Sequence, residues 1–286
     1  MNVTIVTPSY NQGEFIERTI QSVQDQVCSG VSVEHIIFDG LSSDNTIDIL
    51  RKYDGIIKWK SEKDEGQADA VNKGFKIASG DIIGWLNSDD TFEPNAIKTV
   101  VEYFEAFPEV DIVYGDANHI ASDGSHIDCY PTESWCPKRL KDVCFICQPS
   151  VFFRRSVIKE AGFLDANLQY CMDYEYWLRL ATIGKKFVKI NQVLANSRLY
   201  ETNKTLGSRV KVHVEICQMF KKLFGSVPDV WLFNYAHAKL GNHFVFSHRR
   251  RLFWIVFYSI VSSLRWNKHV RSGMIRQILS WLRASV

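Results

Sequence analysis

Four clusters of polar residues carry the side chains that could do chemistry in this 286-residue chain. They are Pro8-Ser9-Tyr10-Asn11, Asp39-Gly40, Glu62 to Gly66, and Asn87-Ser88-Asp89-Asp90. The last cluster places two adjacent carboxylates, Asp89 and Asp90, close to an amide. Hard oxygen ligands of this kind suit Mg²⁺ or Mn²⁺, which in turn bind phosphates. A plain polar turn, with Asp90 capping the next helix, is the alternative that this tetrapeptide leaves open.

Each cluster directly follows a predicted strand. Short apolar, β-branched runs predict strands at residues 3–7, 33–38, 56–60 and 81–86. The spacing of apolar residues predicts helices at 14–26, 44–53 and 67–78 between them. This alternation predicts an α/β fold with a mostly parallel sheet and helices on both faces. Ligands bind at the carboxyl ends of strands in such sheets, so the four clusters are expected at one edge.

The rest of the chain divides into a mixed part and a helical part. Further patterns predict a helix at 93–107, a strand at 111–115, an irregular stretch at 129–150, a strand at 151–153 and a helix at 172–183. After Lys204 the pattern is wholly helical, near 208–224, 229–247, 251–264 and 269–284, with breaks at Pro228, at His248 to Arg250 and at Asn267. We therefore expect one domain over residues 1–205 and a helical extension over 206–286.

Composition and charge exclude some classes of protein. A hydrophobic content of 46% and a charged content of 23% exclude disordered and low-complexity chains. The formal charge of +2 combines a net −7 over residues 1–229 with a last stretch of 57 residues that has 9 Lys or Arg and no acid. Such a basic, aromatic stretch favours anionic lipid or nucleic acid as a partner.

The ends of the chain and its cysteines bear on the compartment. Met1 leads directly into a β-like stretch without the pattern of a signal peptide, which predicts a protein that is not secreted. The longest apolar run, Leu252 to Leu264, is shorter than the roughly 20 residues of a spanning helix. The 7 cysteines are expected to be reduced. A zinc site at Cys144 and Cys147 with Cys129 and Cys136 lacks a second tight pair, so these four are expected to be small buried hydrophobes.

Five motifs occur in a specific order. They are Thr7-Pro8-Ser9-Tyr10-Asn11; Asp39-Gly40 with Ser43-Asp44-Asn45-Thr46; Asp64-Glu65-Gly66-Gln67 with Asn72-Lys73-Gly74; Ala78-Ser79-Gly80-Asp81; and Leu86-Asn87-Ser88-Asp89-Asp90. No one of them is specific, but the set in this order resembles the family 2 glycosyltransferases of GT-A fold, over about residues 1–205. The resemblance implies a Rossmann-like domain that binds a nucleotide-sugar and transfers the sugar with inversion.

The resemblance also implies roles for the matching residues. Pro8, Ser9, Tyr10 and Asn11 would line the ribose and the diphosphate, and Asp39 would accept a hydrogen bond from the base. Asp64, Gln67 and Asn72, with Asn87 and Ser88, would complete the nucleotide and sugar pocket. Asp90, Gln148 and Pro149 would face the donor sugar or the acceptor. Arg198 and Lys204 would neutralise phosphates from a flexible loop. Ordinary turn, capping or solvated positions remain alternatives for these side chains.

Two carboxylates would carry the catalysis. Asp89 matches the metal ligand of the family's D-x-D motif, although Asn87 replaces the first aspartate, and it would hold Mn²⁺ or Mg²⁺. Asp173, in Met172 to Arg179, matches the base that deprotonates the acceptor hydroxyl, with Met172 in place of a glutamate; a helix cap is the alternative for Asp173. Tyr200 stands where relatives often carry a metal-binding histidine.

The basic, aromatic stretch suggests where the acceptor is. Its composition suits helices at a membrane interface, whereas a helical subdomain packed on the rest of the chain is the plainer alternative. Bulky apolar residues interrupt its basic ones too often for nucleic-acid binding. We expect a cytoplasmic enzyme at the inner face of the membrane, acting on a polyprenyl-diphosphate-linked glycan in surface-polysaccharide synthesis. An inactive nucleotide-sugar or glycan-binding protein is the alternative function, and a nucleotidyltransferase would need a Gly-rich basic loop in place of Pro8 to Asn11.

Overall fold

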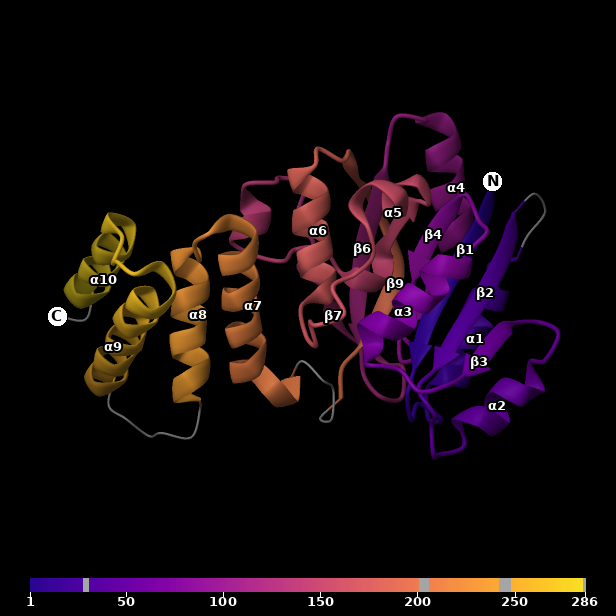
Figure 1. Cartoon of the computed structure of the whole chain (residues 1–286), viewed down its shortest axis with the longest axis horizontal. Coiled ribbons are helices and arrows are strands. Elements are labelled where there is room, and N and C mark those ends of the chain that lie inside the picture. Colours follow the sequence, from indigo (N-terminus) through magenta and orange to yellow (C-terminus); the bar gives the residue numbers. More distant parts are fainter. Residues whose placement is uncertain (28–30, 201–205, 242–247, 285–286) are drawn as a thin grey trace. The chain divides into compact units, whose positions relative to one another are not determined.

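The computed structural model describes residues 1–27, 31–200, 206–241 and 248–284. The chain divides into two compact units, Met1–Tyr200 and Glu201–Val286. The first unit is a sheet flanked by helices, and the second is built from helices (Figure 1).

The described residues of the first unit form one nine-stranded sheet. Its order is β3-β2-β1-β4-β8-β6-β9-β5, with β7 paired to β6. The strands β3, β2, β1 and β4 are parallel, as β6 and β9 are, while β8, β7 and β5 join antiparallel. The bounds are β1 Asn2–Ser9, β2 Ser32–Asp39, β3 Lys58–Ser61, β4 Ile82–Trp85, β5 Thr91–Phe92, β6 Ile112–Ile120, β7 His126–Cys129, β8 Val151–Arg154 and β9 Phe187–Arg198.

Helices cover both faces of this sheet because its strands are apolar on both sides. Ile37 of β2 packs with the helices α1 (Ile16–Gln24) and α2 (Thr46–Lys52), and α4 (Ala96–Ala106) packs on the same side against β1. The neighbouring Ile36 points the other way, towards Ala70 of α3 (Gln67–Ile77). The helices α5 (Ser156–Ala161) and α6 (Met172–Thr182) complete the unit. The expected α/β fold class is therefore confirmed, and every predicted strand and helix of residues 1–107 is present, with β1 and β2 longer than predicted and the others shorter.

The second unit contains α7 (Arg209–Phe224), α8 (Asp229–Leu240), α9 (His248–Asn267) and α10 (Ser272–Ala284). Aromatic pairs hold α8 to its three neighbours: Phe220 with Trp231, Tyr235 with Trp266 and Phe233 with Trp281. The helices follow the predicted segments, with one correction. His248 to Arg250 do not separate two helices but begin α9. No helix among the described residues is long and apolar enough to cross a membrane.

The described cysteines differ in their exposure to solvent. Cys147 is buried, as expected, but Cys129 and Cys136 are exposed. The reason is that Cys129 lies at the end of β7, whose four residues all face solvent. Within the described ranges, no group of three or more His, Cys, Asp or Glu side chains is placed to hold a metal ion by itself.

A buried histidine links the sheet to the pH dependence of folding. His35 of β2 is buried, its Nε2 lies 2.9 Å from Thr7 Oγ1, and burial lowers its pKa to about 3. In the unfolded chain the His35 imidazole binds a proton near pH 6.5, whereas in the folded chain it stays neutral down to about pH 3. The free energy of unfolding therefore decreases as the pH falls below 6.5. Between pH 7.5 and 5 the wild type should lose about 2 kcal/mol more unfolding free energy than His35→Gln, which does not titrate. Urea unfolding at both pH values measures this; equal losses would contradict it.

Candidate active site

The sheet register brings the polar clusters to one edge. Ser9 at the end of β1 pairs with Asp39 at the end of β2, and Asp39 pairs with Ser61 at the end of β3. On the other side of β1, Val6 pairs with Trp85, the last residue of β4. The loops that follow these strands therefore begin side by side, at the carboxyl edge where parallel sheets bind ligands.

Asp39 anchors the loop after β2. Its side chain is only 1% exposed. Its carboxylate accepts hydrogen bonds from the Ser42 N–H at 2.9 Å, from the Ser42 hydroxyl and from the Ser61 hydroxyl at 2.7 Å. Ser42 and Ser61 already donate three hydrogen bonds to this carboxylate, and its contact with a base stays a prediction. Asp39 fixes the loop against which a base would lie.

The loop after β1 is fastened to the same place. The Asn11 N–H donates to Ser42 Oγ at 2.7 Å, and Asn11 Oδ1 accepts from the Ser43 N–H at 2.8 Å. These bonds hold Asn11 in the left-handed conformation, with φ of 51°. They leave Tyr10 61% exposed, so its ring is free to stack on a planar ligand.

A buried hydroxyl and a closely approaching carboxylate lie beside this loop. Ser9 is buried, and its hydroxyl lacks a partner among the described residues, whereas Pro8 is simply part of the strand. Buried hydroxyls are usually hydrogen-bonded. Asp64 lies over Gly40: a Cβ on Gly40 would come within 2.6 Å of Asp64 Oδ2, and Asp64 Oδ1 accepts from the Gly66 N–H at 2.9 Å. A larger residue at position 40 would therefore have to displace the Asp64 carboxylate.

Asn87 is the centre of an amide network. Its Oδ1 accepts from Gln67 Nε2 at 2.8 Å and from the Trp85 indole N–H at 2.9 Å. Its Nδ2 donates to Asp90 Oδ2 at 3.2 Å and to Gln148 Oε1 at 2.9 Å. An amide can make these four bonds, but an aspartate has no proton to donate to Asp90. This explains asparagine at a position where the related motif has aspartate.

The network also corrects expectations for two residues. Gln148 and Pro149 are buried, and the Gln148 amide donates to the Trp85 carbonyl as well as accepting from Asn87. Both of its polar atoms are therefore hydrogen-bonded inside the protein. Gln148 holds Asn87 and the end of β4 in place and does not face a sugar. Gln67, in contrast, is only partly buried, and the network brings it beside Asn87 as expected.

The adjacent carboxylates Asp89 and Asp90 differ in their surroundings. Asp90 is buried and accepts from the Arg198 N–H at 2.9 Å and from Asn87, so it is an internal residue and not a sugar contact. Asp89 is partly exposed, and its Oδ2 accepts from the Tyr200 hydroxyl at 2.9 Å. Burial raises the pKa of Asp90 well above its usual value, and the charge of Asp89 adds to this. Burial raises the pKa of Asp89 too, and the Tyr200 hydrogen bond opposes it.

Arg198 is an internal residue as well. It is 1% exposed, and its guanidinium donates to the backbone carbonyls of Asp89 at 2.7 Å and Ala121 at 2.8 Å. The expectation that Arg198 stands on a flexible loop is therefore wrong, whereas its role in neutralising phosphates stays a prediction. Arg198 is the last residue of β9, and it holds the backbone of Asp89 in place. Lys204 and the rest of that expected loop lie outside the described residues, and Ser88 is buried.

Asp173 lies in the first turn of α6, where the helix dipole favours a negative charge. It is only partly buried. Its charge and that of Asp90 both add to burial in raising the pKa of the Cys147 thiol. The negative charges of Asp173 and Asp90 thus both act on the same buried thiol.

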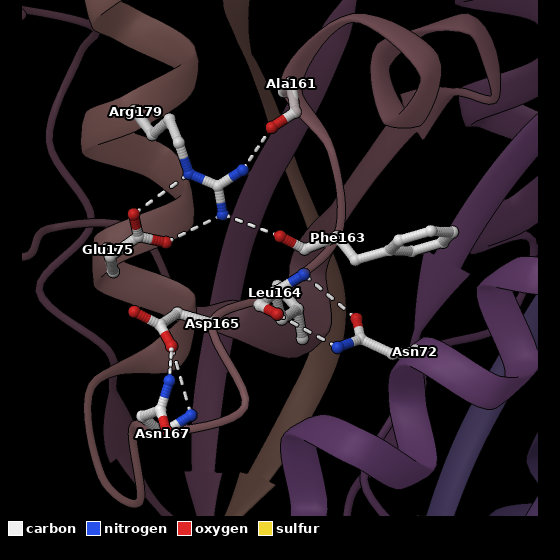
Figure 2. A network of polar contacts seen from close by, with 8 residues as sticks. All are labelled: Asn72, Ala161, Phe163, Leu164, Asp165, Asn167, Glu175 and Arg179. Carbon is white, nitrogen blue, oxygen red and sulfur yellow. Dashed lines mark hydrogen bonds and ion pairs between the residues drawn. The ribbon is translucent and has the colours of Figure 1, made fainter.

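An ion pair between Arg179 and the buried Glu175 fixes α6 to the segment before it. Figure 2 shows Arg179 between Glu175 and the carbonyl groups of Ala161 and Phe163. The pair is close, at 2.8 Å between Arg179 Nη2 and Glu175 Oε2, and Glu175 is buried. These bonds join α6 to the segment before it, which limits the movement of Asp173 relative to that segment.

Asn72 belongs to this support and not to the pocket. Its Nδ2 donates to the Leu164 carbonyl and its Oδ1 accepts from the Leu164 N–H, both at 2.9 Å (Figure 2). The side chain is buried with both polar atoms in use, so the expected contact with the ligand is wrong. Asn72 instead ties α3 to the segment that carries α6.

One carboxylate is suitably placed for a divalent ion. Asn87 and Asp90 use their oxygens internally, whereas Asp89 is partly exposed and gives one oxygen to Tyr200. Mg²⁺ often takes one or two protein carboxylates together with substrate phosphates and waters. The residues present therefore fit an ion that Asp89 shares with a diphosphate, and they do not fit an ion held by protein alone.

Comparisons with known proteins bear on the family and the fold. The model of the family described as Glycosyl transferase family 2 matches residues 4–162. The hyaluronan synthase of Pasteurella multocida is 29% identical over 218 residues, which are 74% of this chain and 22% of that protein. The chain thus spans about a fifth of the length of this relative.

Solved structures show the fold. S. aureus TarS 1–349 in complex with UDP-GlcNAc superposes with a TM-score of 0.65 at 15% identity, covering 90% of this chain and 79% of that chain. The mannosyltransferase PcManGT from Pyrobaculum calidifontis, in complex with GDP-Man and Mn²⁺, gives 0.61 at 15% identity, covering 99% and 80%. Both neighbours have the GT-A fold, as expected for this chain.

Proposed function

Because this chain belongs to glycosyl transferase family 2, we propose that it transfers a sugar from a nucleotide-diphosphate donor to a hydroxyl group of a glycan. The observation that carries the proposal is the edge formed by the ends of β1, β2 and β4. There the exposed Tyr10, the Ser9 hydroxyl, which lacks a partner within the described ranges, and the partly exposed Asp89 lie at the ends of β1 and β4. We favour a UDP-sugar, such as the one bound by TarS, and both named structural neighbours bind nucleotide-sugars.

Asp89 would hold Mn²⁺ or Mg²⁺ together with the donor's diphosphate. Such an ion, when bound, neutralises the charge that develops on the leaving diphosphate. The Mn²⁺ in PcManGT supports this assignment. Tyr200 orients the Asp89 carboxylate, and Arg198 holds its backbone, so the chain presents one fixed oxygen ligand.

Asp173 would act as the general base. It would take the proton of the acceptor hydroxyl while that oxygen attacks the anomeric carbon from the side opposite the diphosphate, which inverts the configuration. Three features support this role: its partial exposure, its place in the first turn of α6, and the Arg179–Glu175 pair that fixes the helix. A base must be ionised to act, and the helix N-terminus favours the ionised form.

The acceptor would be a growing polysaccharide chain carried by a polyprenyl diphosphate. The hyaluronan synthase relative supports polysaccharide synthesis. The stretch after Asp229, which has 9 basic and no acidic residues, supports an acceptor at an anionic membrane and does not fit a nucleic-acid partner. We place the enzyme in the cytoplasm at the inner face of the membrane, associated peripherally.

Radiolabelled sugar transfer tests the proposed function. The full-length protein, Mn²⁺ and a panel of labelled UDP-, GDP- and dTDP-sugars are incubated with a lipid extract from the source cells. One donor should move its label into the organic phase in proportion to the nucleoside diphosphate released. Donor binding without any transfer, across the full panel and extract, would favour an inactive nucleotide-sugar-binding protein instead.

A further inference from the structure

The helix α9 exposes large apolar side chains on one face and buries three serines on the opposite face. Three serines, Ser259, Ser262 and Ser263, are buried. Large apolar side chains at Phe253, Trp254, Phe257, Val261 and Leu264 are exposed, Phe253 to 63%. At 3.6 residues per turn these five fall within an arc of about 100°, on the side opposite the serines.

The inner face of α9 carries the buried Ile255 and Trp266 as well as the serines. Ile255 and Tyr258 of α9 pack against Ala236 and Leu240 of α8. The hydroxyl groups are satisfied within the structure: Ser259 Oγ donates to the Ile255 carbonyl at 2.7 Å. The aromatic residues are therefore not displaced core residues, and their exposure has to be explained by another contact.

The helix α10 presents a second stripe. Ile275, Leu279 and Leu282 are each 47% exposed and occupy one face at positions i, i+4 and i+7. Met274 and Ile278 are buried, and Trp281 contacts Phe233 of α8. Because α9 and α10 both pack on α8 through their inner faces, both stripes point away from α8.

Basic residues border both stripes. Arg251 and Arg265 are exposed beside the α9 stripe, and Arg276 and Arg283 are exposed beside the α10 stripe. No acidic residue follows Asp229 in the sequence. Long basic side chains can place their charge at headgroup level while their stems cover apolar surface.

We infer that the exposed stripes of α9 and α10 form one docking face that lies in the interface of an anionic lipid bilayer. Apolar and aromatic residues would enter the acyl boundary, and the bordering arginines would bind lipid phosphates. A second copy of this chain fits less well, because a twofold contact would bring the same arginines together without any acid to pair them. The inference rests on the proposed function in one respect: the docking face would bring the enzyme to a lipid-linked acceptor.

Vesicle flotation of the full-length protein tests this face. The wild type should float with vesicles containing phosphatidylglycerol, bind pure phosphatidylcholine vesicles at least 10-fold less, and be released by high salt. A triple variant, Phe253→Ser with Trp254→Ser and Phe257→Ser, should lose at least 10-fold in binding. The matched control changes three exposed isoleucines of the first unit, Ile77, Ile127 and Ile183, to serine and should bind like the wild type.

Two results would overturn the inference. One is equal flotation of the triple variant and the wild type. The other is a dimeric wild type that the triple variant converts to a monomer in light scattering, since the face would then be covered by a second copy. Nucleotide binding, measured by thermal shift on the same samples, shows separately whether the donor site and the proposed function hold.

Discussion

Asp173→Asn should reduce sugar transfer by about 100- to 10,000-fold, the range by which general bases accelerate reactions. The substitution keeps the shape of the side chain but removes its ability to take a proton. Nucleotide affinity should stay within a few-fold of the wild type, because the base acts on the acceptor and not on the donor. Steady-state transfer assays with the best donor, together with nucleotide titrations, measure the two effects separately.

The matched control for this variant is Asp48→Asn. Asp48 also lies in the first turn of a helix, α2, and there it is largely exposed and pairs with Arg51 at 2.9 Å. It should cost a few tenths of a kcal/mol in stability and nothing in transfer. Near wild-type transfer by Asp173→Asn would show that another group takes the acceptor proton.

Asp89→Asn should abolish the Mn²⁺ dependence of nucleotide binding and lower transfer by about 100-fold or more, as removal of a group that stabilises developing charge usually does. The variant should fold at least as well as the wild type. The charge of Asp89 now raises the pKa of Asp90, so its removal relieves repulsion between two neighbouring carboxylates. Nucleotide titration with and without Mn²⁺, and thermal unfolding without ligands, measure these effects.

Asp25→Asn serves as the control for Asp89, since Asp25 is an exposed carboxylate at the end of α1. It should leave both nucleotide binding and its Mn²⁺ dependence unchanged. If Asp89→Asn still bound nucleotide more tightly with Mn²⁺ than without it, the ion would have to be held by other groups, and the assignment of Asp89 would fail.

The first half of the sheet could be predicted from the sequence because its local signals agree. The strands β1, β2 and β4 are short apolar runs that end in polar clusters, and each is separated from the next by an amphipathic helix. This regular alternation is enough to place Ser9, Asp39 and the residues after Trp85 at one edge of a parallel sheet.

The strand β9 could not be predicted in the same way. Its burial does not alternate along residues 187–198, because its pairing with β6 contains register shifts and it pairs with β5 only near its end. The alternation of buried and exposed residues that identifies a strand is therefore absent from the sequence. Without that signal, Arg198 was predicted to lie on a loop. The pairing of Ile120 with Arg198 in fact places that arginine inside the sheet.

The positions of site residues were easier to predict than their bonding. Asp39, Asn72 and Gln148 are all among the predicted site residues, yet each bonds at least one group far away in the sequence. Their partners include Ser61, the backbone of Leu164 and the carbonyl of Trp85. Sequence spacing does not show such long-range partners. The Ser42 hydroxyl, which links Asp39 to the Asn11 loop, was missed, although a serine shortly after an Asp-Gly turn is a usable signal.

The central claim is that the carboxyl edge of β1, β2 and β4 binds a nucleoside diphosphate together with a divalent ion. Thermal shift with UDP, GDP, dTDP and CDP, each with and without Mn²⁺, tests it most directly, because a ligand of the folded state raises the unfolding temperature. We predict a clear shift with one nucleotide, UDP by preference, that requires Mn²⁺ and is lost in Asp89→Asn. No shift with any of the four nucleotides would contradict the account.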